Sequence, residues 1–212
     1  MSESDLAISM ALGVGLAAAT GFRVFLPLLV MSAAANTGHL PLSEGFAWLA
    51  TPTALAMLGV AALAEILAYY VPGVDNLLDA LATPGAFLAG TVAAAAVMTD
   101  LPPIVKWATA IIAGGGAAGL MQSVTALARA NSTALTAGLG NPVIATAELL
   151  GAGLVSILAV AAPFAALAVV VVFAWLALRL LRRLLRRGDP RASDPGASGP
   201  RASGPPASGG SG

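Results

Sequence analysis

Three ionisable side chains stand inside long apolar segments of the sequence, namely Arg23, Glu65 and Glu148. A charge at the centre of a bilayer costs about 2.5–3.5 kcal/mol on insertion scales, so such a side chain faces the interior of a helix bundle and marks a pathway, a proton relay or an ion pair. We therefore expect Arg23 to meet a carboxylate. Glu65 is our first choice of partner, followed by Glu148 and then Asp75 or Asp79. The alternative is that Arg23 extends to the membrane surface.

Further polar groups follow Glu65 at helical spacing. Tyr69 lies four residues after Glu65 and therefore on the same helix face. Asp75 and Asp79 are also four residues apart, after the Val-Pro-Gly turn. They are typical of a helix cap with an acidic first turn, or of two carboxylates that hold a proton or a hard cation such as Mg²⁺. They are weak candidates for a metal site, whose existence we leave open.

The segment from residue 121 to residue 153 holds the other candidate binding groups. Gln122 can hydrogen-bond across helices, and we expect Arg129 to end its helix at the membrane surface. The turn "GLGNP" precedes the helix that carries Glu148. A helix that begins at Asn141 and Pro142 presents free amide groups to an anion, although Asn-Pro is equally typical of an ordinary helix start.

No catalytic constellation is found in the sequence. The chain has no cysteine and one histidine, His39, so a thiolate or imidazole-rich metal site within one chain is excluded. Ser123, Ser132 and Ser156 have no histidine base. The glycine run "AGGGAAG" lacks the lysine of a phosphate-binding loop. We expect no cofactor and no enzymatic activity.

The elements that must position these residues are membrane helices. Of the 212 residues, 58% are hydrophobic and 9% are charged, and the mean hydropathy is +0.89, whereas soluble domains carry about 25% charged residues. A bilayer core of roughly 30 Å requires about 20 apolar residues of helix. This length predicts an all-α integral membrane protein with about six spans, near residues 7–34, 51–71, 83–99, 104–128, 141–161 and 164–184.

Two boundaries need comment. Gly21 and Pro27 predict that the first helix is interrupted between them, beside Arg23. Pro163 marks either a tight hairpin or a kink in one long helix. We favour the hairpin, because residues 141–184 as a single helix would be about 66 Å long at ~1.5 Å per residue.

The basic residues predict the orientation. Seven of the ten lie at or after Arg179, directly behind the last apolar segment. This pattern is typical of a cytoplasmic helix end and not of a nucleic-acid site. Six spans then place both termini in the cytoplasm of a bacterial inner-membrane protein. We expect a membrane domain over residues 1–187 and a disordered Pro/Gly/Ser/Ala-rich tail over 188–212.

An internal duplication is suggested by two glycine-alanine runs, at residues 11–23 and 113–124, each followed by a helix with a lone glutamate. Two three-helix units would have opposite orientations, which is a recurrent transporter plan with the binding site at the repeat interface. The alternative is that Gly/Ala-rich helices resemble one another by composition alone.

Three stretches, "GFRVFLPLL" (21–29), "E...YYVPGVDNLLD" (65–79) and "ARANSTALTAGLGNP" with the following "AELLGA" (128–142, 147–152), resemble the bacterial membrane-protein family catalogued as domain of unknown function 4126. The resemblance covers roughly residues 7 to 175. It implies a compact multi-span bundle and no particular activity.

These observations favour a small membrane transporter or channel-like protein with an intramembrane Arg/Glu/Asp site. Its expected partners are the lipid bilayer and a small solute or ion, and a homo-oligomer remains open. One alternative is a non-catalytic scaffold or assembly factor in which the buried ion pair is structural. The other is a lipid- or quinone-handling membrane protein that depends on a divalent metal at Asp75 and Asp79.

Overall fold

The computed structural model describes residues 3–71, 74–99 and 101–187, with only the backbone described for 75–77, 79, 177 and 180–187. The described chain is helical, without strands. Its described residues up to Leu176 form one compact unit, which contains the helix bundle, and those from Ala177 on belong to a second unit. The predicted tail over 188–212 lies outside the described residues.

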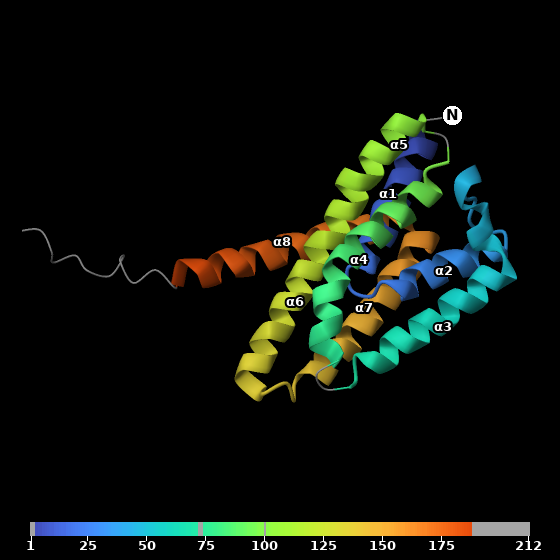
Figure 1. The fold of residues 1–212 in the computed structure, drawn as a ribbon. Helices are drawn as coiled ribbons and strands as arrows, with labels where there is room; N and C mark the ends of the chain where they lie inside the picture. Colours follow the sequence, from blue (N-terminus) through green and yellow to red (C-terminus); the bar gives the residue numbers. More distant parts are fainter. Residues whose placement is uncertain (1–2, 72–73, 100, 188–212) are drawn as a thin grey trace, which may run out of the picture. The chain divides into compact units, whose positions relative to one another are not determined.

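The helices correspond to the predicted segments (Figure 1), but α4 begins at Val74 instead of residue 83, and the helix predicted to end at residue 128 continues to Thr136. Residues 103–136 form one continuous helical rod, made of α5, the π-helical turn η2 and α6. A short 3-10 helix, η1, precedes α3. The bounds are α1 Glu3–Thr20, α2 Phe25–Asn36, η1 Glu44–Ala50, α3 Pro52–Ala68, α4 Val74–Val97, α5 Pro103–Thr109, η2 Ala110–Gly115, α6 Gly116–Thr136, α7 Asn141–Ala161 and α8 Pro163–Arg187.

Helix α1 is the centre of the bundle, and its second half is almost entirely buried against α4, α6 and α7. Around α1, the contacts of α4 with α6 and with η2 are between small residues. A Cβ added to Gly90 of α4 would lie 2.4 Å from the Cβ of Ala118, and one added to Gly114 would lie 2.6 Å from the Cβ of Ala94. In lipid, where helices gain little from hydrophobic burial, such close backbone approach provides van der Waals packing.

The predicted interruption of the first helix is confirmed, and it lies at residues 21–24, between α1 and α2. Gly21 presses on α6, because a Cβ there would lie 2.4 Å from both the carbonyl oxygen of Ala118 and the Cβ of Met121. Pro27 lies in the first turn of α2, where its missing N–H breaks no helical bond. The break therefore precedes the proline, and it places Arg23 in the interior of the bundle.

The predicted hairpin after α7 is also confirmed. Ala162, with φ −150° and ψ 76°, separates α7 from α8. Ala159 and Ala166 both pack on Gly15 of α1, and one further turn from the bend Val155 and Val170 share a cluster with the next turn of α1. Both helices thus advance along α1 together as they leave the bend, so they run antiparallel to each other.

The apolar helices are those of a membrane protein, but they do not establish six spans. Three segments of the described chain are long and apolar enough to cross a membrane, namely 80–97, 103–136 and 141–161. A fourth is obtained if η1 and α3, which meet at 71°, count together. The break divides the first predicted span into shorter helices, and the described apolar part of α8 ends at Leu176.

Candidate functional site

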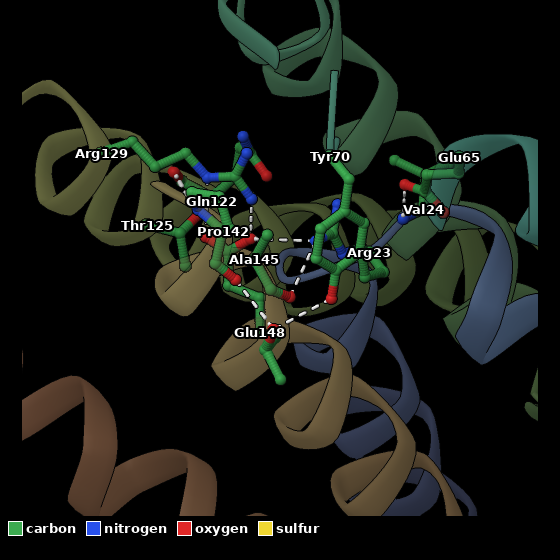
Figure 2. Close-up of polar contacts among 11 residues, drawn as sticks. Arg23, Val24, Glu65, Tyr70, Gln122, Thr125, Arg129, Pro142, Ala145 and Glu148 are labelled. Carbon is green, nitrogen blue, oxygen red and sulfur yellow. Dashed lines mark hydrogen bonds and ion pairs between the residues drawn. The ribbon is translucent and has the colours of Figure 1, made fainter. Parts of the chain in front are cut away.

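Arg23 lies in the break between α1 and α2 and is 1% exposed. Its Nη2 donates a hydrogen bond to the carbonyl oxygen of Ala145 at 2.9 Å and lies 3.6 Å from Oε2 of Glu148. Figure 2 shows the side chain pointing from the break toward α7. The expected interior position of Arg23 is confirmed, and its glutamate partner is Glu148.

Arg129 of α6 binds the same carboxylate. Its Nε donates to Oε1 of Glu148 at 3.0 Å, and its Nη2 forms an ion pair with Oε2. Arg129 is 2% exposed, so the expectation that it ends α6 at the membrane surface was wrong. One buried glutamate is thus shared by two guanidinium groups that approach it from different elements (Figure 2).

Tyr69, at the C-terminal end of α3, contacts both cations through its ring. The ring centre lies 3.8 Å from Cζ of Arg23 and 4.1 Å from Cζ of Arg129. The face of an aromatic ring carries partial negative charge, so it attracts both guanidinium groups and offsets part of their mutual repulsion. The four side chains form what we call the arginine cluster: Arg23, Tyr69, Arg129 and Glu148.

Glu65 has a different role from the one expected. Its Oε1 accepts a hydrogen bond from the backbone N–H of Val24 at 2.7 Å, and its Oε2 accepts one from Phe25 at 3.0 Å. The first N–H groups of a helix lack intrahelical acceptors and attract negative charge, so Glu65 caps α2 from a neighbouring helix. Our first choice of Glu65 as the partner of Arg23 was therefore wrong.

The remaining candidates divide into three groups. Gln122 is buried on the same face of α6 as Arg129 and appears beside it in Figure 2. Asn141 is buried at the start of α7, where its Nδ2 donates to Oγ1 of Thr133 at 3.0 Å and closes the hairpin between α6 and α7. Glu148 follows Asn141 by seven positions, so the two residues lie roughly 10 Å apart along α7. The side chains of Asp75 and Asp79 lie outside the described residues, so the metal prediction stays a prediction.

Two cavities adjoin these residues, and each is lined by a different glutamate. The first, which we call the α7 groove, has a volume of about 490 Å³ and is lined by α6, α7, α8 and Phe22. Its polar lining residues are Glu148 and Thr125. The second, of about 440 Å³, lies between the start of α2, α3 and α4, and its polar lining residues are Glu65 and Tyr69. A largely apolar cavity therefore adjoins each of the two buried glutamates, Glu148 and Glu65.

Arg129 is the cluster residue that the sequence reasoning missed. A usable signal was present, because Arg129 lies seven residues before the end of α6 and Glu148 lies seven residues after the start of α7. Residues equally far from the turn of an antiparallel helix pair lie at the same level. The turn itself is tight, with Ala137 and Gly138 at φ 53° and 87°.

A family model described as Domain of unknown function (DUF4126) matches residues 10–183, which include all four residues of the arginine cluster. No curated protein and no solved structure matches the chain.

Proposed function

We propose that this chain, which belongs to the family described as Domain of unknown function (DUF4126), is a small membrane transporter or channel-like protein whose arginine cluster binds the permeating solute. The observation that carries the proposal is the sharing of Glu148 by Arg23 and Arg129 in the bundle interior, next to a helix break. Charged groups at such depth are costly and mark solute pathways, proton relays or structural ion pairs.

The surroundings of the cluster support a pathway. An interrupted helix at the depth of a binding site is a recurrent feature of transporters, since its free backbone groups contact the solute. Here the break holds Arg23, and the α2 end of the break is capped by Glu65. The α7 groove is lined by Glu148, and the second cavity is lined by Glu65 and Tyr69. A solute could therefore approach the cluster by two routes.

The topology forms part of the proposal. We assign α1 with α2, α3, α4, the α5–α6 rod, α7 and α8 to six crossings of a bacterial inner membrane, with both termini in the cytoplasm. The arginine-rich end of the chain favours this orientation. Two inverted units of three crossings would bring the break of the first unit against α6 and α7 of the second, which is where Arg23 meets Glu148.

Flux through reconstituted vesicles tests the proposal. Vesicles with the full chain are shrunk by an external excess of sodium chloride, sodium acetate, sodium benzoate or glycerol, and re-swelling is followed by light scattering. We expect protein-dependent re-swelling in at least one solute, and its loss in Arg23→Gln and Glu148→Gln. His39→Gln, at an exposed residue, is the control. Absence of flux in all four solutes, with folded protein in the vesicles, overturns the proposal.

A second candidate, a scaffold or assembly factor, is favoured by the close matching of charges between Arg129 and Glu148. In that case the cluster is structural. Arg23→Ala and Glu148→Gln would then each lose folding, and no variant that folds would change flux. The metal-dependent alternative requires turnover that disappears in Asp79→Asn.

A further inference from the structure

We infer that the solute is a monocarboxylate with an apolar tail, whose carboxylate replaces that of Glu148 between the two arginines while the tail lies in the α7 groove. The inference rests on the proposed function and names the substrate class of the same site. The group that already lies between Arg23 and Arg129 is a carboxylate, that of Glu148.

The geometry of the arginines is selective for such a head group. Arg129 presents Nε and Nη2 to the two oxygens of Glu148, and Arg23 adds Nη2 from a second direction. A guanidinium fork matches a planar carboxylate in this two-point manner. Both arginines are buried, so an anion at this position is bound away from water, where charge-assisted hydrogen bonds are strong.

The α7 groove begins at the same carboxylate. Glu148 lines it, and beyond Glu148 and Thr125 its walls are apolar. A volume of about 490 Å³ lies within the range of about 300–1,000 Å³ that is usual for small-molecule sites. A ligand with its head at the arginines would therefore have its apolar part in this groove. The lining residues include Ala147 of α7 and Phe173 of α8.

The exchange conserves charge. A proton binds Glu148 and forms an O–H bond, and the neutral carboxyl group leaves the guanidinium groups and turns toward Thr125. The carboxylate of the solute then takes its place, so the net charge of the cluster is the same before and after. An unchanged buried charge avoids the several kcal/mol that an uncompensated ion costs inside a protein. One proton would thus accompany each anion.

The groups that face Glu148 come from several elements. Arg129 and Gln122 lie on α6, Arg23 lies in the break, and Tyr69 and Glu65 lie at the end of α3. The residues of α8 in the groove, Val169, Val170 and Phe173, are apolar. The acidic residues of α4, Asp75 and Asp79, have side chains outside the described residues.

Benzoate binding to the purified full chain in detergent, measured by calorimetry at about pH 5.5 and about pH 7.5, tests the inference. Coupling to one proton predicts tighter binding at the lower pH, by at most about tenfold per pH unit. Glu148→Gln should remove this pH dependence, because its amide is neutral at both values. Arg129→Gln should weaken binding by about tenfold or more, as expected for loss of charged hydrogen bonds.

The groove is tested separately with Ala147→Trp, which places a large side chain at a lining residue. This variant should lower the preference for benzoate over acetate, and His39→Gln, at an exposed residue outside the groove, should preserve it. These two variants keep the test valid if Glu148→Gln does not fold. An absence of benzoate binding by wild type, or a preference unaffected by Ala147→Trp, overturns the inference. Flux of another solute without benzoate binding would refute this inference alone, whereas benzoate binding without any flux would refute the transport proposal.

Discussion

Arg129 and Glu148 lie opposite each other across the α6–α7 hairpin, each seven residues from the turn, with Nε of the arginine 3.0 Å from Oε1 of the glutamate. The pair is local in sequence, since Glu148 follows Arg129 by nineteen positions. Arg23, by contrast, is distant in sequence and contacts the same carboxylate from the break between α1 and α2. The cluster therefore joins the helix break to the α6–α7 hairpin.

The first prediction concerns this pair. Arg129→Gln should lower the free energy of unfolding by about 3–5 kcal/mol, because it removes one partner of a buried ion pair. The double variant Arg129→Gln with Glu148→Gln should recover little of the loss, because it also removes the carboxylate that Arg23 contacts. Unfolding of the purified chain in mixed micelles, followed by circular dichroism, measures both. Arg179→Gln, at an exposed arginine, should change stability by less than about 0.5 kcal/mol. Equal losses of stability in Arg129→Gln and Arg179→Gln would contradict the prediction.

The second prediction concerns the cap of α2. Glu65→Gln keeps one oxygen acceptor but removes the negative charge that faces the N–H groups of Val24 and Phe25. We expect a loss of about 1–2 kcal/mol and faster hydrogen exchange at these two amides. Mass spectrometry of the peptide that contains them measures the exchange. Glu44→Gln, at an exposed glutamate in the first turn of η1, should leave their exchange unchanged.

The sequence predicted the helices well because their ends carry strong signals. Asn141 and Pro142 start α7 where expected, Pro163 starts α8, and Gly21 marks the break after α1. The number of membrane crossings was harder to predict from the sequence. A broken helix can cross once or return to the same side, and composition does not distinguish these cases.

The site was predicted in part. Arg23, Glu65, Asp75, Asp79 and Glu148 were expected in one polar site, and the structure brings Arg23 and Glu148 together. The partner of Arg23 was missed because burial of a glutamate has two causes that look alike in sequence. One is an ion pair, as for Glu148, and the other is a helix N-terminus that needs acceptors, as for Glu65. Only the tertiary arrangement shows which cause applies.

The third prediction concerns the ring between the arginines. Tyr69→Leu should destabilise the protein by about 2 kcal/mol, since a desolvated cation–π contact is worth about that much and Tyr69 contacts two guanidinium groups. The neighbouring Tyr70 is a matched control. It is 41% exposed, and its hydroxyl group bonds to Oγ1 of Thr146 at 2.9 Å. Thermal unfolding of both leucine variants measures the difference, and a larger loss for Tyr70→Leu would contradict the prediction.

The fourth prediction concerns the helix break itself. Gly21→Ala would place a Cβ 2.4 Å from the carbonyl oxygen of Ala118 and from the Cβ of Met121. Since α6 has to move to accept it, we expect a loss of about 1–3 kcal/mol and weaker binding of whatever solute the arginine cluster takes, because Arg23 is two residues away. Gly116→Ala is the control, as a Cβ there meets nothing within 4 Å. Within a helix this change should stabilise the chain by roughly 0.5–1 kcal/mol. Unfolding curves of the two variants should therefore shift in opposite directions, and a Gly21→Ala protein as stable as Gly116→Ala would show that the break does not depend on this contact.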